Sequence, residues 1–357
     1  MTTFDPPILL TVIIPTYNEE ETLPVLLNDL RKQEHVSLET IIADGGSVDR
    51  TQAVAEAFGA IFIKTSRGRG SQMNAATERA QGSCLLFLHA DTAITDPDLL
   101  SNALQAFAAE FHCNENVAGH FQLSFKRTTK QNNMAYRYAE EKTAFNRMNT
   151  TNGDQGLLLT TAFFKKIGGF DERLPFLEDQ RIAEKIRCQG MLMTLPGTIT
   201  TSARRFEKEG FHRRYILMSM IMGLHSIGVE TFFTRAPGLY QVQQETARLL
   251  LSPFFGLIWK IMAEEWGVCK TISTFYKLGR YIRQNSWQMF YFLDVWIRPL
   301  LGRGRYPFLN FHDRIFAPCT TFPVFNAITG ILCFIWFMGI LSPFFWVTDN
   351  VGKKMRT

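Results

Sequence analysis

Apolar and polar residues alternate in blocks along the first half of the chain. Short apolar runs are followed by stretches in which apolar residues recur every three or four positions, and Gly or Pro separates the blocks. The predicted strands are residues 8–14, beginning at Ile8, and 40–43, 61–63 and 84–88; the predicted helices begin near 23, 49, 71 and 96, the last with Pro97 at its first position. This order indicates an α/β fold with a doubly wound, Rossmann-like, mostly parallel sheet.

Polar side chains follow several of these strands. In a doubly wound sheet the carboxyl ends of the strands meet at one edge, where ligands bind. We expect the following residues to converge there: Thr16, Tyr17, Glu19, Asp44, Arg67, Arg69, His89 and Asp91. Further along, GDQGLLLTT from residue 153 predicts a loop and a strand, and Glu178-Asp179 opens a helix whose Ile182 and Ile186 face inward.

The chain becomes richer in aromatic and large aliphatic residues beyond residue 212. We therefore predict a first domain at 1–212, an amphipathic or interfacial helical region at 213–314, and a hydrophobic membrane segment with a basic tail at 315–357. For the middle region two alternatives stay open. Its helices lie either in the headgroup layer of a membrane or in a helical subdomain packed on the first domain.

The last region contains a candidate membrane segment. No charged residue lies between Ile315 and Thr348, and residues 322–347 are long enough to cross a hydrocarbon layer of ~30 Å. Pro323 and Pro343 would also suit a re-entrant hairpin. Both topologies stay open. The orientation stays open too, because basic residues flank the segment on both sides: Arg303, Arg305 and Arg314 before, and Lys353, Lys354 and Arg356 after.

Charge and cysteine content narrow the class and the compartment. The net charge of +5 is modest and the basic residues are scattered, so the chain is not expected to bind nucleic acid. The six cysteines form no CxxC pair, which indicates reduced thiols and no structural disulfide. The first residues lack the pattern of a signal peptide. We therefore expect the first domain at the cytoplasmic face of the inner membrane.

Six short motifs occur in one order: PTYNEE, IIADGGSVDRT, RGRGSQMNAA, LFLHADT, LPFLED and SARRF. In this order they resemble the inverting family-2 glycosyltransferases with the GT-A fold, and within them a bacterial subgroup that carries HAD where others carry DXD. The resemblance extends from about Leu10 to about Tyr240, and we recognise no family in residues 241–357. It implies an enzyme that transfers a sugar from a nucleotide-sugar donor to an acceptor.

The resemblance also implies a metal ion and a donor pocket. A departing nucleoside diphosphate carries about two negative charges, which Mg²⁺ or Mn²⁺ holds through oxygen ligands. Asp91 matches the family's metal ligand. His89 stands where an acidic residue is more usual, and is either a hydrogen-bonding residue or a ligand. The positions that match donor-binding residues of the family are Pro15, Thr16, Tyr17, Glu19, Asp44, Arg69, Asp91, Arg204 and Arg205.

Asp179 matches the family's catalytic base, which takes the proton of the attacking acceptor hydroxyl. Such assistance typically accelerates a reaction by roughly 10²- to 10⁴-fold. Glu178 would shape the surroundings of the base or meet the acceptor, and two adjacent carboxylates can raise the pKa of one of them. Arg205-Phe206 resembles the Arg-Trp of processive members, but Thr201 or Ser202 replaces their Gln, so we expect single transfers.

Each motif also has a simpler interpretation. Asp44 could only close a turn, and Glu178-Asp179 could only complement a helix dipole. Arg67 and Arg69 could lie in a solvated loop, and the loop at 152–155 is either an ordinary turn or the edge of an acceptor site.

The sequence thus predicts a metal-dependent, inverting, non-processive glycosyltransferase that uses a nucleotide-sugar, with uridine diphosphate favoured, and a lipid or lipid-linked acceptor at a membrane. One alternative is a sugar nucleotidyltransferase, which needs a Gly-rich basic loop where PTYNEE stands. The other is a non-catalytic membrane scaffold, against which Asp44, Asp91 and Asp179 together argue.

Overall fold

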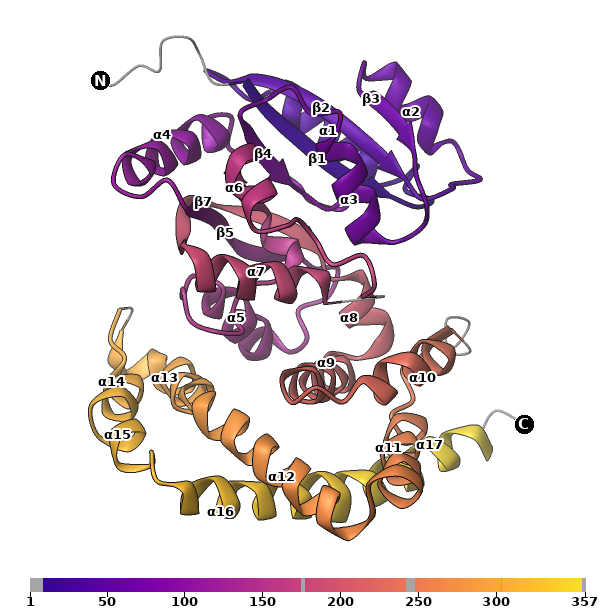
Figure 1. Cartoon of the computed structure of the whole chain (residues 1–357), viewed down its shortest axis with the longest axis vertical. Helices are drawn as coiled ribbons and strands as arrows, with labels where there is room; N and C mark the ends of the chain where they lie inside the picture. Colours follow the sequence, from indigo (N-terminus) through magenta and orange to yellow (C-terminus); the bar gives the residue numbers. More distant parts are fainter. Residues whose placement is uncertain (1–8, 175–176, 242–247, 303, 355–357) are drawn as a thin grey trace. The chain divides into compact units, whose positions relative to one another are not determined.

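The computed structural model describes residues 9–174, 177–241, 248–302 and 304–354 (Figure 1). The predicted positions Ile8, Pro175, Phe176, Arg303 and Arg356 lie outside these ranges. The chain divides into two compact units. The first unit comprises Met1–Thr128 and Ala135–Ala203, and the second comprises Thr129–Met134 and Arg204–Thr357. The division therefore falls after Ala203, before the predicted boundary at 212, and both predicted C-terminal regions belong to the second unit.

The first unit is built on a seven-stranded sheet in the order β3-β2-β1-β4-β6-β5-β7. Its strands are β1 (Leu9–Thr16), β2 (Ser37–Asp44), β3 (Ile61–Lys64), β4 (Cys84–Phe87), β5 (Val117–Lys126), β6 (Leu157–Thr160) and β7 (Met191–Ser202). Neighbouring strands pair in parallel except that β6 is antiparallel to both β4 and β5. The predicted α/β fold with a mostly parallel sheet is confirmed.

Helices cover both faces of this sheet. They are α1 (Leu23–Arg31), α2 (Thr51–Ala57), α3 (Arg69–Thr77), α4 (Leu99–Phe111), α5 (Asn133–Lys142), α6 (Thr161–Lys166) and α7 (Glu178–Gln189). Val12 and Ile14 of β1 pack in one buried cluster with α1 and α4, whereas Ile13 packs in another with α3, α6 and α7. Successive residues of a strand point to opposite faces, so the sheet is doubly wound. The prediction that Pro97 opens a helix was wrong, because α4 begins at Leu99 after a short turn.

The second unit is helical. Its helices are α8 (Arg204–Glu209), α9 (Phe211–Ser226), α10 (Glu230–Gln241), α11 (Ser252–Ile261), α12 (Gly267–Gln284), α13 (Trp287–Leu301), α14 (Pro307–Phe311), α15 (Ala317–Cys319), α16 (Pro323–Phe334) and α17 (Ser342–Lys354). Segments with π-helical turns join some of them: η2 (Met262–Trp266), η3 (His312–Phe316) and η4 (Ile335–Leu341). Buried apolar residues of α9 to α12 and of the last helices form one core. The choice between helices in a headgroup layer and a subdomain packed on the first domain stays a prediction.

The predicted membrane segment forms one continuous helix through α16, η4 and α17. Residues Pro323–Val351 of it are long and apolar enough to cross a membrane, with a mean hydropathy of 2.1, and no other helix within the described residues is. The re-entrant alternative was wrong, because the helix does not turn back at Pro343. The wider π-helical turns of η4, just before Pro343, accommodate a residue that lacks a backbone N–H.

Candidate active site

The strands β1, β2 and β4 end at the same edge of the sheet, and polar residues follow them. Thr16 pairs with Asp44 in the register of β1 and β2, and the Thr16 hydroxyl donates a hydrogen bond of 3.2 Å to Asp44 Oδ1. Gln72 of α3 donates to the carbonyl oxygens of Thr16 and Ala43, at 2.8 and 2.7 Å. The start of α3 is thereby fixed against this edge.

Asp44 is buried, and its carboxylate accepts hydrogen bonds within its own turn. The donors are the backbone N–H groups of Gly46 and Ser47, at 2.9 and 2.8 Å, and the Ser47 hydroxyl. Gly46 has a φ of 92°, in the region that favours glycine. Asp44 therefore shapes the DGGS loop in the way its simpler interpretation requires, and its contact with a donor stays a prediction.

The loop after β1 holds the other residues predicted to line the donor pocket. Tyr17 is partly exposed, and the guanidinium of Arg67 lies over its ring, 3.9 Å from the centroid. The Glu19 carboxylate accepts a bond of 2.5 Å from the Thr22 hydroxyl, just before α1. Pro15 is part of the buried strand β1 itself. Tyr17 and Arg67 thus present an aromatic ring and a cation at this edge.

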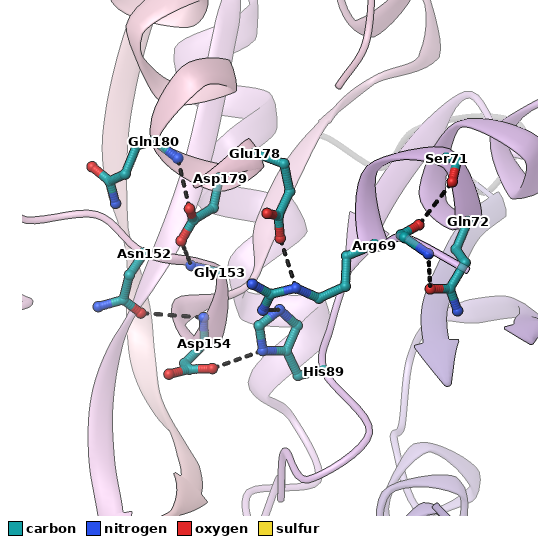
Figure 2. Close-up of polar contacts among 11 residues, drawn as sticks. Arg69, Ser71, Gln72, His89, Asn152, Gly153, Asp154, Glu178, Asp179 and Gln180 are labelled. Atoms are coloured by element: carbon teal, nitrogen blue, oxygen red, sulfur yellow. Dashed lines mark hydrogen bonds and ion pairs between the residues drawn. The ribbon is translucent and has the colours of Figure 1, made fainter. Parts of the chain in front are cut away.

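Arg69 and Glu178 form an ion pair between α3 and α7. Arg69 Nε lies 2.7 Å from Glu178 Oε1, and Glu178 is only 2% exposed (Figure 2). Burial lowers the pKa of Arg69, but the carboxylates of Glu178, Asp179, Asp154 and Asp91 outweigh it, and the net pKa of Arg69 is raised. Arg69 thus contacts the carboxylate of Glu178 directly, and the charges of three further carboxylates also act on it.

The predicted base Asp179 is held by backbone N–H groups. Its Oδ2 accepts from Gly153 at 2.7 Å and its Oδ1 from Gln180 at 2.8 Å. Leu177, two residues earlier, has a left-handed φ of 70°, which is rare for a residue with a branched side chain and turns the chain sharply into α7. Burial, followed by the charge of Asp179, raises the pKa of Glu178 against the opposing effect of Arg69. Of the two adjacent carboxylates, Glu178 is the one with the raised pKa.

His89 and Asp154 join the β4 loop to a short 3₁₀ turn, η1 (Gly153–Gln155). His89 Nδ1 lies 2.7 Å from Asp154 Oδ1, and His89 Nε2 lies 3.5 Å from Arg69 Nη1 (Figure 2). Burial lowers the pKa of His89. The hydrogen bond to Asp154 and the negative charge of Asp154 raise it by more, so the pKa of His89 lies above its ordinary value. His89 is thus a hydrogen-bonding residue in this structure.

The residues fit a divalent cation. One donor atom each from His89, Asp91 and Asp154 lies within 4.8 Å of the others, and all three residues are partly exposed. Two carboxylate oxygens and an imidazole nitrogen suit Mn²⁺, and the oxygens also suit Mg²⁺. The predicted ligand Asp91 belongs to this group, and Asp154 is a candidate ligand that the sequence prediction missed.

The η1 turn, predicted to be either an ordinary turn or the edge of an acceptor site, contacts several residues of the site. The Gly153 N–H donates to the Asp179 carboxylate, and the Asp154 carboxylate contacts His89 Nδ1. The fully buried Gln155 donates to the backbone oxygens of Phe121 and Thr143. A pocket beside it is lined by apolar residues and by His89, Gly153, Glu178 and Asp179. The letters GDQ before a strand were the available signal, but a turn motif alone does not show what it contacts.

Two of the predicted donor-binding residues belong to the second unit. Arg204 and Arg205 begin α8 in the second unit, so their approach to a bound diphosphate stays a prediction. Within the first unit, the structure brings Arg69, Asp91, Glu178 and Asp179 together with His89 and Asp154.

Part of the first unit is similar to known glycosyltransferases. Residues 11–164 match the family described as Glycosyl transferase family 2. The PGL/p-HBAD biosynthesis glycosyltransferase of Mycobacterium bovis (strain BCG / Pasteur 1173P2) is 32% identical over 118 residues, which are 31% of this chain and 46% of that protein. The poly(ribitol-phosphate) beta-N-acetylglucosaminyltransferase TarS of Staphylococcus aureus (strain Mu50 / ATCC 700699) is 33% identical over 111 residues, 29% of this chain and 19% of TarS. The chain thus spans less than half the length of these curated relatives.

Among solved structures, residues 1–349 of S. aureus TarS in complex with UDP match 92% of this chain and 91% of that chain, with 18% identity and a TM-score of 0.47. The mannosyltransferase PcManGT from Pyrobaculum calidifontis, in complex with GDP-Man and Mn²⁺, matches 92% of this chain and 88% of that chain, with 18% identity and a TM-score of 0.46. Residues 11–164 match the model of the family described as Glycosyl transferase family 2, the family that the ordered motifs resemble.

Proposed function

We propose that the chain is a metal-dependent, inverting glycosyltransferase of the GT-A type and of the subgroup with HAD in place of DXD. It transfers one sugar at a time from a nucleotide-sugar, with a uridine diphosphate donor favoured, to a lipid or lipid-linked acceptor. It acts at the cytoplasmic face of the inner membrane. The observation that carries this proposal is the gathering of Asp91, Asp154, Glu178 and Asp179 around Arg69 at the carboxyl edge of the sheet.

The arrangement separates two tasks. On one side, His89, Asp91 and Asp154 would hold the cation, which when bound neutralises charge on the departing diphosphate. On the other side, Asp179 takes the proton of the acceptor hydroxyl as that oxygen attacks the anomeric carbon from the face opposite the diphosphate. Attack from the opposite face inverts the anomeric configuration.

The local contacts suit Asp179 for this role. The N–H groups of Gly153 and Gln180 each occupy one lone pair of a carboxylate oxygen and fix the orientation of the carboxylate. A second lone pair on each oxygen serves as the proton acceptor. The buried Glu178 is tied to Arg69, so it supports the base and keeps Arg69 in the site.

The donor and the acceptor are supported by different observations. The partly exposed ring of Tyr17 under Arg67 offers a stacking surface for a nucleoside, and the sequence relative TarS is described as a beta-N-acetylglucosaminyltransferase. The apolar helix at Pro323–Val351 supports a membrane location and hence an acceptor in or on a membrane.

The proposal is tested by measuring donor binding and sugar transfer separately. A panel of nucleotide-sugars is titrated into the full chain by calorimetry with and without Mn²⁺, and transfer is followed with membrane lipid extracts as acceptor. Asp179→Asn should keep donor binding and lower transfer by about 10²-fold or more. Asp91→Ala should lose the part of donor binding that depends on Mn²⁺. Glu184→Gln, on the exposed side of α7, is the matched control and should change neither.

Transfer at the normal rate by Asp179→Asn would show that another group is the base. Formation of a nucleotide-sugar from a sugar phosphate and a nucleoside triphosphate would instead favour the sugar nucleotidyltransferase, and failure to bind any nucleotide-sugar would favour the non-catalytic scaffold.

A further inference from the structure

The helix at Pro323–Val351 is covered by the second unit along one stripe only. Only 22% of its most apolar window is buried. Trp336 is 52% exposed and Trp346 is 64% exposed, and between them Ile340 and Phe344 are exposed as well. The exposed apolar residues of this helix are Val324, Ile328, Ile331, Leu332, Ile335, Trp336, Ile340, Phe344, Trp346, Val347 and Val351. A surface of this extent indicates an apolar partner.

The covered stripe is fixed by α12 along its first half. Phe275 stacks edge-on against Phe334 with ring centroids 5.0 Å apart, and Arg283 Nε donates to Asn326 Oδ1 at 2.8 Å. Residue numbers therefore rise in opposite directions along the two helices. At their closest approach a Cβ on Gly279 would lie only 2.4 Å from the backbone nitrogen of Gly330.

The second half of the stripe is covered by α11. This helix contacts α17, whereas α12 contacts α16, so the two cover successive parts of the long helix (Figure 1). The Trp259 indole donates to the Ser342 hydroxyl at 3.1 Å, and its ring also meets that of Phe334. At the far end Asp349 accepts from the N–H groups of Leu251 and Ser252. The long helix thus contacts α11 and α12 from residue 326 to residue 349. If the long helix spans a membrane or lies in its plane, α11 and α12 must do the same.

Exposed charges on α11 and α12 are incompatible with a spanning orientation. Lys260 follows Trp259, which contacts Phe334 and Ser342 in the middle of the long helix. The Lys260 side chain is 62% exposed, and its Nζ lies 3.8 Å from the carboxylate of Glu264, which is itself 50% exposed. A spanning helix would bring this ammonium group to the depth of the acyl chains, where a charged side chain is costly. Lys270 and Lys277 of α12 are exposed as well.

We propose that the second unit is a monotopic membrane platform. The helix at Pro323–Val351 lies in the plane of a single leaflet, with its exposed apolar side chains among the acyl chains. The basic residues of α12 lie at the level of the headgroups. This inference rests on the membrane location proposed above and adds that both ends of the helix stay on one side of the bilayer.

The observations favour a lipid surface with anionic headgroups over a second copy of the chain. The sequence of α12 contains Lys270, Lys277, Arg280 and Arg283 and no acidic residue, so its charge complements anionic lipid and would repel another copy of itself. At about 100° per residue, Lys270 and Lys277 lie on the side of α12 opposite Gly279, away from the long helix. Trp336 and Trp346 are of the type enriched where acyl chains meet headgroups.

Cysteine labelling tests which side of the membrane each end of the helix occupies. Three full-length variants each keep one cysteine: native Cys188 in the first unit, native Cys319 before the long helix, or the cysteine introduced by Asn350→Cys near its end. All three positions are exposed. Buried Cys84 and Cys333 are replaced by Ala and the other cysteines by Ser. Sealed inverted membrane vesicles are treated with a membrane-impermeant maleimide before and after addition of detergent.

The in-plane orientation predicts that all three cysteines are labelled to the same extent before detergent is added. Labelling of one end of the helix only after detergent would overturn this inference and leave the proposed membrane location intact. Recovery of the chain in the soluble fraction, as a monomer or as a dimer held by this surface, would overturn both. Donor binding by each variant confirms that the substitutions have not unfolded the first unit.

Discussion

Glu178 is a buried carboxylate whose charge is balanced by one guanidinium. Removing only the guanidinium, in Arg69→Met, leaves the buried carboxylate without its cation and beside the charge of Asp179. We expect the free energy of unfolding to fall by about 2 kcal/mol, less than for a fully buried pair because Arg69 is 44% exposed. Urea denaturation of the full chain in detergent measures the loss.

The double variant with Arg69→Met and Glu178→Gln should recover most of that stability, because no buried charge remains. A double variant that is less stable than Arg69→Met alone would show that Glu178 does not depend on this cation. The comparison reads stability rather than activity, so it is independent of the role proposed for Arg69 in the reaction.

His120 is a buried neutral histidine of the first unit. Burial lowers its pKa to about 4. The hydrogen bond with the Phe121 carbonyl raises the pKa, and the charge of Arg187 lowers it further. Gln155 Nε2 lies 2.9 Å from His120 Nδ1. At pH values between 6.5, the ordinary pKa of histidine, and about 4, its pKa in the folded chain, the unfolded chain binds a proton that the folded chain does not. Stability contributed by the neutral ring is therefore present above this window and is lost as the pH falls through it.

His120→Gln removes this titration. From pH 7 to pH 5, we expect the wild type to lose about 2 kcal/mol more of its unfolding free energy than the variant. Urea midpoints at the two pH values measure the difference. Equal losses in the two proteins would mean that folding does not lower the pKa of His120.

Single residues show how far the sequence could predict the site. Asp91, Arg69 and the pair at 178–179 were predicted, because each follows a strand or opens a helix within a recognisable motif. Asp154 was missed as a ligand candidate, because its contact with His89 spans 65 positions in the sequence and depends on the pairing of β6 beside β4. Periodicity carries no information about such contacts.

The elements of the first unit were predicted because their signals are local. Apolar runs predicted β1, β2, β3 and β4, and helical spacing predicted α1 to α3 and α7. The antiparallel direction of β6 could not be predicted in the same way. It depends on which neighbours the strand meets after a long excursion of the chain through β5 and α5.

The contact between α12 and α16 offers a test at the scale of elements. A methyl group at Gly279 would lie 2.1 Å from the carbonyl oxygen of Asn326, so the two helices must separate. We expect Gly279→Ala to lower the unfolding free energy by about 1–3 kcal/mol, as overpacking does. Thermal unfolding in detergent measures the change.

Gly256 of α11 is the matched control, because a Cβ there meets nothing within 4 Å. Gly256→Ala should leave stability unchanged or raise it by up to about 1 kcal/mol, since Ala favours the helix more than Gly does. If the two substitutions have the same effect, the close approach of α12 and α16 is not what Gly279 provides.

At the scale of the whole molecule, the chain combines a polar sheet domain with an apolar helical unit. The composition change beyond residue 212 revealed this division, but it placed the boundary late, because α8 is polar and yet belongs to the second unit. Composition also could not distinguish a membrane helix from a buried one. That distinction requires the exposed fraction of each side chain, which only the packed structure supplies.

Binding to vesicles follows from this exposure. Ile331 is 61% exposed on the long helix, whereas Val25 is 46% exposed on α1 of the sheet domain. Burying an isoleucine in lipid is worth about 1.5–3 kcal/mol, so Ile331→Glu should weaken binding of the full chain to anionic vesicles by about tenfold or more in flotation assays. Val25→Glu introduces the same charge in the first unit, at a residue that does not belong to the proposed surface, and should have little effect. Raised salt should weaken the binding of both variants, because it screens α12 from the headgroups. Equal binding by the two variants would place the membrane contact elsewhere on the molecule.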